Sequence, residues 1–273
     1  MLGLGAAALA ATLAACGRGR PAGLATQAAD SGATSVTANG ARPQSRAPSA
    51  SRSVVPPPAS TPTATRRPNS PAVEVGNGPR TVNQVALTFH GAGDDAIARQ
   101  LLAILAQHRA RATVFAVGTW VEQSPDVVRA VAAGGHELGN HTYRHLDIDS
   151  LDAATARSEI VRCRDLLART VRSPAPLFRP SQTQHATPEV LALAGQAGYA
   201  TCVSYDIDSL DYTDPGPDAI RSAAAAARRG SIVSLHFGHA GTVAALPAIL
   251  TDLAARKLTP VTVSTLLAAQ GAR

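Results

Sequence analysis

The sequence predicts an α/β domain whose parallel strands close into a barrel, and three observations lead to this prediction. Short runs rich in β-branched residues alternate with amphipathic stretches from about residue 80 onward. Helix caps followed by proline separate several of these runs. The candidate strands number seven: residues 84–89, 112–117, 136–139, 177–179, 200–205, 231–235 and 260–263. Seven strand–helix repeats are consistent with a deformed parallel (β/α)7 barrel, although periodicity alone leaves a doubly wound open sheet as the alternative.

The helical stretches are recognised by their starts and their periodicity. Ser124 and Thr187 each precede a proline, which is typical of the first helical turn. Residues 152–171 have the apolar spacing of a long amphipathic helix.

The amino-terminal residues 1–16 have the pattern of a lipoprotein signal peptide. The run from Met1 to Ala15 is apolar but shorter than the roughly 20 residues that a membrane-spanning helix needs. The residues from Leu13 to Cys16 resemble a bacterial lipobox, in which the cysteine is acylated. One departure is that no Lys or Arg precedes the apolar run. We therefore expect Cys16 to anchor the protein outside the cytoplasm, on the outer face of the cytoplasmic membrane; the alternative is a cytosolic protein with an apolar amino terminus.

Residues 17–79 are rich in Ala, Pro, Ser, Thr, Gly and Arg, which predicts a disordered tether before a folded domain at residues 80–273. The positive charge lies in this stretch, because residues 17–80 hold eight Arg, one Asp and one Glu. The remaining residues carry 17 basic and 17 acidic side chains. A neutral folded domain argues against a nucleic-acid partner.

Two cysteines lie within the predicted domain, Cys163 in a helical stretch and Cys202 in a strand. In an exported protein they could pair, or both could be buried free thiols. Sequence spacing leaves both alternatives open.

Polar residues gather where the predicted strands end. His90, Arg179 and His236 each follow or close a strand, and so do a pair of histidines after the third strand and three aspartates after the fifth. In parallel barrels the loops that follow the strands meet at one face, where active sites are placed. These positions therefore predict an enzyme site at that face.

Several segments resemble motifs of the NodB-type polysaccharide deacetylases, which form carbohydrate esterase family four, and they follow one another along the chain in the same order as in that family. The most specific is the His141-Thr-Tyr-Arg-His145 run in its Gly-His-Glu-Leu-Gly-Asn setting. The others are residues 112–118, 178–180, 208–212 and 234–236. The resemblance implies a barrel of the glycoside hydrolase–deacetylase type, one divalent metal, usually zinc, and removal of N-acetyl groups from aminosugar polymers. His141 and His145 would share the metal, since residues four apart on a helical turn lie on one face.

The first motif of the family departs from its usual form in this chain. The family reads Thr-Phe-Asp-Asp-Gly, with one aspartate as catalytic base and the next as metal ligand, whereas this chain reads Thr-Phe-His-Gly-Ala-Gly-Asp-Asp from Thr88. In one interpretation, the glycines let Asp94 fold back as the third metal ligand while His90 acts as the base. In another, the site has lost its base and perhaps its metal, which leaves a sugar-binding relic. The structural alternative for Asp94 by itself is a cap at the start of the following helix.

The remaining motif positions carry over from the family. Arg179 matches the arginine that orients the base, although with His90 there it could pair with an aspartate after the fifth strand instead. Asp211 matches the partner of the catalytic acid, and His236 matches that acid. Gln182 would supply an oxyanion donor through its backbone N–H, and Tyr212 replaces a tryptophan in the groove wall. His185 and His239 receive no role beyond the rim of the site.

The expected activity is hydrolysis of a carbon–nitrogen bond in a peptidoglycan or chitin-like polymer by a monomer. Two alternatives remain from the sequence. One is a catalytically impaired, glycan-binding relic of the same fold, and the other is a metal-dependent hydrolase of another substrate.

Overall fold

The computed structural model describes residues 70–269 of the protein. The predicted signal peptide with Cys16 lies outside the described residues, as does the predicted tether up to residue 69.

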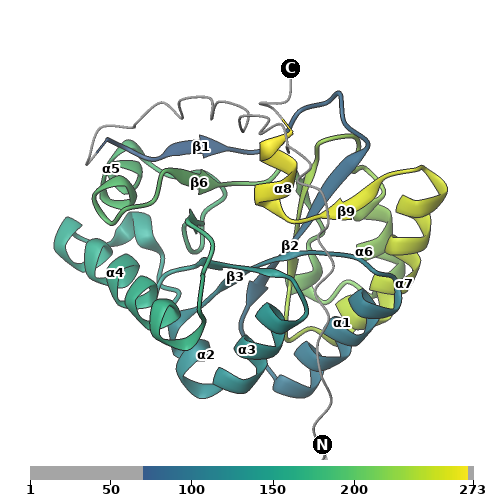
Figure 1. The fold of residues 1–273 in the computed structure, drawn as a ribbon, viewed down its shortest axis with the longest axis horizontal. Helices are drawn as coiled ribbons and strands as arrows, with labels where there is room; N and C mark the ends of the chain where they lie inside the picture. The colour runs from purple at the N-terminus through teal and green to yellow at the C-terminus, as the bar shows by residue number, and fades with distance from the viewer. Residues whose placement is uncertain (1–69, 270–273) are drawn as a thin grey trace, which may run out of the picture. The chain divides into compact units, whose positions relative to one another are not determined.

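The described residues contain nine parallel strands in one sheet, which curls into a deformed barrel and confirms the predicted fold (Figure 1). The strand order is β1-β6-β5-β4-β3-β2-β8-β7, and β9 pairs with the first residues of β2. All seven predicted strands are present. The strands are β1 (Val73–Val75), β2 (Gln84–Gly91), β3 (Thr113–Ala116), β4 (Glu137–Asn140), β5 (Leu177–Phe178), β6 (Thr201–Val203), β7 (Ile207–Asp208), β8 (Ile232–His236) and β9 (Thr259–Val261).

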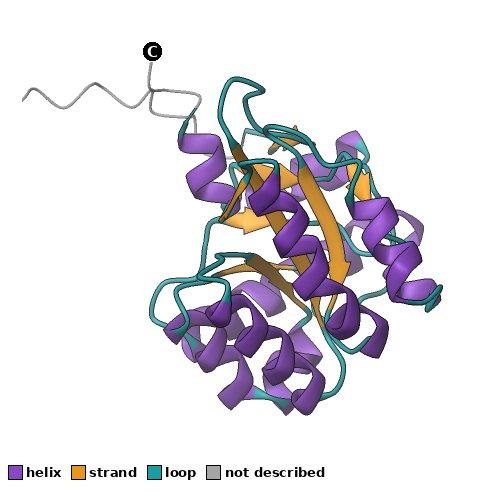
Figure 2. Cartoon of the chain, turned by 90° about the vertical axis from the view of Figure 1, so that its right-hand side faces the viewer, coloured by secondary structure: helices purple, strands orange, loops and turns teal. Residues whose placement is uncertain are grey.

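Helices cover the outside of this sheet (Figure 2). The outer helices contact one another in the order α5, α4, α2, α3, α1, α7 and α6. Their bounds are α1 (Asp95–Gln107), α2 (Gly118–Gln123), α3 (Pro125–Ala133), α4 (Ala153–Thr170), α5 (Pro188–Gln196), α6 (Pro217–Ala224) and α7 (Ala240–Ala255), followed by α8 (Val263–Ala268) and two 3-10 turns, η1 (Ile148–Ser150) and η2 (Asp211–Thr213). None of the described helices is both long and apolar enough to cross a bilayer.

Alternation along β2 decides which side chains enter the barrel. Val85, Leu87 and Phe89 belong to the large apolar cluster under the outer helices. Ala86 instead joins the cluster inside the barrel. Since successive side chains of a strand point to opposite faces, the next inward positions after Ala86 are Thr88 and His90.

The barrel interior is apolar at one end and polar at the other. The apolar end is built by side chains from five strands and by α8, which inserts two residues: Ala86, Phe115, Leu177, Val203, Ile232, Val263 and Leu266. Beyond this cluster, toward the carboxyl ends of the strands, polar side chains occupy the inward positions of β2 and β8. The apolar cluster thus fills the end of the barrel opposite the polar side chains.

The folded domain begins earlier than the boundary expected at residue 80. Ala72 is buried in a cluster with Phe178 and Tyr199, and β1 pairs in parallel with β6. The sequence does not reveal β1, because three residues after a proline-rich stretch carry almost no periodicity. Residues 70–79 therefore belong to the barrel and not to the predicted tether.

Both cysteines of the domain are buried free thiols, and this resolves the alternative that the sequence left open. Cys163 lies under the outer helices, whereas Cys202 lies in the separate cluster around Phe178. Burial raises the pKa of each thiol to about 12, so neither is reactive at neutral pH.

We predict that Gly195→Ala destabilises the domain. A Cβ at Gly195 would lie 2.1 Å from the Ser70 carbonyl oxygen, so the segment entering β1 would have to move away from α5. Overpacking of this kind costs about 1–3 kcal/mol, against a gain of up to about 1 kcal/mol from helix propensity. The free energy of unfolding from urea titration of the full-length chain measures the net effect.

The matched control is Gly76→Ala, where the nearest atom to an added Cβ is the Tyr205 carbonyl oxygen at 4.0 Å. Its effect should stay within about 0.5 kcal/mol. Equal stability of the two variants would contradict the placement of residues 70–71 against α5.

Candidate active site

The site begins with two histidines that face each other across neighbouring strands. The β2–β8 register places Thr88 opposite Ser234 and His90 opposite His236. All four positions point into the barrel by the alternation of the strands. The rings of His90 and His236 are 4.2 Å apart between centroids, and His90 Nε2 lies 3.4 Å from Ser234 Oγ.

His141 and His145 lie on an irregular turn after β4 and not on the helical turn that their spacing predicted. Thr142 and His145 both have left-handed backbone conformations, with φ of 64° and 58°. The rings nevertheless converge, and the two Nε2 atoms are 3.1 Å apart. The two rings therefore lie together as the four-residue spacing predicted, although the backbone between them is an irregular turn and not a helical one.

Buried side chains hold this turn in its left-handed conformation. Asn140 Oδ1 accepts from the Thr142 N–H, while its Nδ2 donates to the Ile160 carbonyl and to Tyr199. Glu159 of α4, also buried, accepts from both the backbone N–H and the Nε of Arg144. Asn140 belongs to the motif quoted from the sequence, but its bracing role was not predicted, and Glu159 was not predicted at all.

His90 completes a cluster with these two histidines. His90 Nδ1 lies 3.1 Å from His141 Nε2, and the three available ring nitrogens lie within 4.8 Å of one another. Nitrogen ligands about 2.0–2.1 Å from a tetrahedral zinc would be about 3.3 Å apart, so two of the three separations fit a metal closely. His141 Nδ1 donates to the Arg179 carbonyl at 3.0 Å, which leaves Nε2 as the nitrogen with a free lone pair.

The protonation of the cluster also suits a metal. Burial lowers the pKa of His90 and of His141 well below the usual range, and the neighbouring histidines lower it further. Burial likewise lowers the pKa of His145, followed by repulsion from His236. Neutral imidazole is the form that binds metals, so these three residues are suited to hold a divalent cation.

Asp94 does not reach this cluster. Its Oδ1 accepts from the N–H groups of Ala96 and Ile97, so its carboxylate caps the amino terminus of α1. Gly93 precedes Asp94 and lets the backbone pass close to that of Gly238. A Cβ on Gly93, which has φ of 101°, would lie 2.6 Å from the Gly238 Cα. The structure therefore places Asp94 in the helix-cap alternative, and His90 stands where a third metal ligand was expected from Asp94.

Arg179 is fully buried and pairs with none of the aspartates considered from the sequence. Its guanidinium donates to Thr88 Oγ1 and to the carbonyls of Val203 and Ser204, and it lies 4.2 Å above the Phe115 ring. Burial lowers its pKa to about 9, so it remains charged at neutral pH. Asp206 instead pairs with Arg80 at 2.7 Å.

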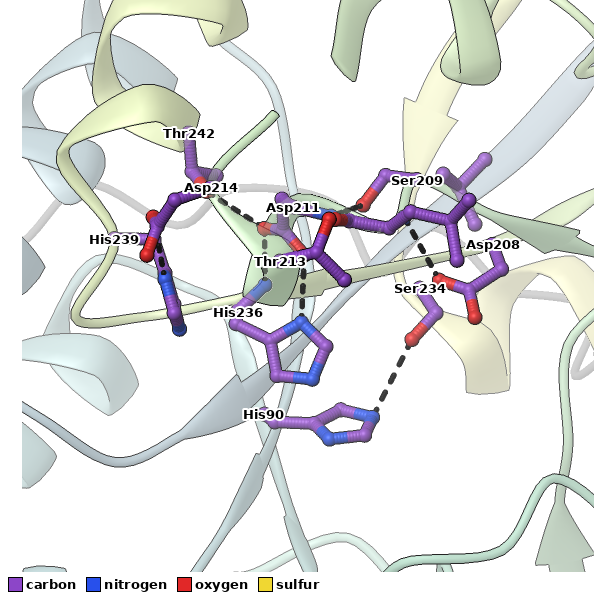
Figure 3. Close-up of polar contacts among 12 residues, drawn as sticks. His90, Asp208, Ser209, Asp211, Thr213, Asp214, Ser234, His236, His239 and Thr242 are labelled. Atoms are coloured by element: carbon purple, nitrogen blue, oxygen red, sulfur yellow. Dashed lines mark hydrogen bonds and ion pairs between the residues drawn. The ribbon is translucent and has the colours of Figure 1, made fainter. Parts of the chain in front are cut away.

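Asp211 and His236 form a pair beside His90 of the three-histidine cluster (Figure 3). His236 Nδ1 lies 2.6 Å from Asp211 Oδ1, while the His236 N–H and the Thr242 hydroxyl both donate to Oδ2. Burial raises the pKa of Asp211, but the hydrogen bonds from His236 and Thr242 outweigh it, so the net pKa lies below its ordinary value. The carboxylate is therefore a fixed anion that orients the imidazole. Thr242 was missed, because its contact depends on how α7 packs.

These groups open into a pocket of about 530 Å³. Its lining comprises His90, His145, Gln182, Thr183, Gln184, Tyr205, Tyr212, His236 and His239. Gln182 adopts φ of 58° and its side chain donates to the His145 carbonyl, while its own N–H has no acceptor among the described residues. Tyr212 is 48 % exposed and its ring lies 5.2 Å from that of His236. His185 lies outside the pocket lining and pairs with Glu74.

Comparisons with known proteins identify relatives of this chain. Residues 77–202 match the model of a family described as polysaccharide deacetylase. The chain is 34% identical over 194 residues to a peptidoglycan-N-acetylglucosamine deacetylase of Bacillus cereus, covering 69% of this chain and 90% of the relative. It is also 36% identical over 160 residues to a chitooligosaccharide deacetylase of a Bradyrhizobium species, covering 57% of this chain and 71% of the relative.

Among solved structures, the fold resembles a mutant of a carbohydrate esterase family 4 pseudoenzyme with restored enzymatic activity. The TM-score is 0.68 at 25% identity, covering 72% of each chain.

Proposed function

Because the chain belongs to the polysaccharide deacetylase family, whose members hydrolyse carbon–nitrogen bonds, we propose that it removes N-acetyl groups from an aminosugar polymer. The observation that carries the proposal is that one pocket is lined both by His90 and His145 of the three-histidine cluster and by His236 of the Asp211–His236 pair. The named relatives act on peptidoglycan and on chitooligosaccharides, and these polymers are the substrate class that we propose.

We assign the metal to His90, His141 and His145, and zinc is the cation that three neutral imidazoles suit best. Bound there, the cation supplies Lewis-acid polarisation of the acetamide carbonyl. The family resemblance supports a metal, while the choice of ligands rests on the distances in this chain.

The chain's own residues then manage charge and protons. Addition of water to the amide carbon develops an oxyanion, and the Gln182 N–H is the backbone donor proposed for it. With Nδ1 bound to Asp211, His236 has Nε2 left for the substrate. We propose that Nε2 takes up the proton released by the attacking water. It then donates this proton to the departing amine as the C–N bond breaks. The products are acetate and a free aminosugar.

A second function has one observation in its favour. The group of described residues able to hold a metal contains histidines alone and no carboxylate, and the first motif lacks both family aspartates. This absence of carboxylates favours a glycan-binding protein without turnover. Acetate release from chitin oligomers or peptidoglycan fragments, with zinc supplied, separates the two functions.

The first prediction of this assignment concerns the metal. His90→Ala should lower zinc affinity at least about 100-fold, because a ligand is removed, as measured by isothermal titration and metal analysis. The matched control is Asp94→Ala, which should retain zinc and lose only about 1 kcal/mol of stability with the helix cap. Zinc loss in the Asp94 variant with retention in the His90 variant would reverse the assignment.

The second prediction concerns the proton-transfer pair. His236→Ala should lower kcat for acetate release by roughly 10²–10⁴-fold, the usual contribution of a general acid or base, with zinc still bound. His108→Ala serves as the control, since His108 ends α1 at an exposed position. Wild-type turnover in the His236 variant would exclude it as the proton donor.

We also propose that Cys16 is acylated and that the enzyme acts outside the cytoplasm, attached to a membrane. The support is the Leu13-Ala-Ala-Cys16 pattern after an apolar run. Cys16→Ser should shift the protein from the membrane fraction to the soluble fraction, or leave the leader uncleaved. A membrane fraction unchanged by this substitution would argue against the anchor.

A further inference from the structure

A second histidine–aspartate pair lies at the same pocket, and no step of the proposed reaction uses it. His239 lines the pocket, and its Nδ1 lies 2.9 Å from Asp214 Oδ1 (Figure 3). This pair repeats the Asp211–His236 pair three residues further along both segments. The two histidine rings are 5.9 Å apart and nearly perpendicular.

Local backbone structure explains the repetition. Asp211–Thr213 form a 3-10 turn, in which residues three apart lie on the same side. Asp214 ends this turn in the left-handed conformation, with φ of 51°, and its N–H donates to the Asp211 carbonyl. Opposite it, Gly238, with φ of 93°, turns the chain between the two histidines. Each histidine is thus brought to its own aspartate.

The two pairs differ in burial and in support. Asp211 is fully buried and accepts from Thr242 as well as from His236, whereas the Asp214 side chain is 69% exposed. His239 stands at the N-cap position of α7, yet its side chain makes no capping hydrogen bond. Exposed ion pairs contribute little to stability. The outer pair therefore has little structural role, and its groups are available to a ligand.

The outer pair is also separated from the reacting end of the pocket. Among the described residues, His239 makes its ring contact with His236 and none with the three-histidine cluster. The same pocket extends from that cluster past His236 to the exposed ring of Tyr212 and to His239, so a polymer bound with its acetamide at the cluster can reach the outer pair.

We propose that His239 and Asp214 form a substrate-binding pair that recognises a hydroxyl group on the sugar unit next to the one that is deacetylated. This inference rests on the proposed function. With Nδ1 donating to Asp214, Nε2 of His239 is left to form a hydrogen bond with a sugar hydroxyl. The exposed Asp214 carboxylate supplies a second acceptor. The pair positions the polymer and takes no part in proton transfer.

The experiment compares binding with turnover for the full-length, zinc-loaded protein and an N-acetylglucosamine tetramer. His239→Ala and Asp214→Asn should each raise KM and the Kd from isothermal titration by about 3- to 10-fold, the loss of one or two hydrogen bonds. The kcat should stay within about twofold. His239→Gln should restore part of the affinity, because its amide oxygen can accept from a hydroxyl.

The matched control is His185→Ala. His185 forms a similar pair with Glu74 at 2.6 Å, but it is 69% exposed and lies outside the pocket lining. This variant should bind and turn over the tetramer like the wild type.

Two results would overturn the proposal: unchanged KM and Kd in both His239 and Asp214 variants, or a kcat loss of 100-fold or more at unchanged KM, which would make the pair catalytic. If the wild type binds the tetramer but releases no acetate, the proposed hydrolysis fails and the Kd comparison still decides the role of the pair. A wild type that binds no tetramer overturns both.

Discussion

The parallel pairing of β2 with β8 is the constraint on which the rest of the site depends. Its register sets Thr88 against Ser234 and His90 against His236. A shift by one residue would turn these side chains toward the outer helices and bring Phe89 and Leu235 into the site. The apolar cluster under the helices prevents that shift, because it holds the intervening side chains of both strands. Packing on the outside of the sheet thus fixes the chemistry inside it.

The charges of the site are arranged around this register. Arg179 is a buried cation whose donors are met by neutral oxygens and whose face lies against Phe115. It and the neighbouring imidazoles disfavour protonation of His90 and His141, as burial does. Asp211 is the compensating anion beside His236, and its three donors hold it ionised. A neutral nitrogen cluster and an oriented imidazole therefore coexist within one pocket.

Strand periodicity was sufficient to predict a parallel α/β sheet and the end of it that carries the polar residues, because both follow from patterns within single segments. The closure of the sheet into a barrel was implied by the family resemblance and not by periodicity. The strands β1 and β7 have three and two residues, too few to show a period. The position of Asp94 could not be derived either. It depends on contact between Gly93 and Gly238, which are far apart in the sequence. Thr242 and Glu159 enter the site through helix packing, which no local pattern encodes.

The space available at the carboxyl end of β2 explains the altered first motif. At Gly91, the position of the second family aspartate, a Cβ would lie 2.7 Å from Val114 Cγ1 and 3.0 Å from Trp120, so this strand end has no room for a side chain. The preceding residue points inward, and its imidazole reaches His141 at 3.1 Å. In the proposed site the third ligand has thus moved one residue back along β2. An anionic carboxylate ligand is thereby replaced by a neutral imidazole ligand. This replacement leaves Arg179 without a carboxylate and gives the Asp211–His236 pair the proton transfers that the missing base would have shared.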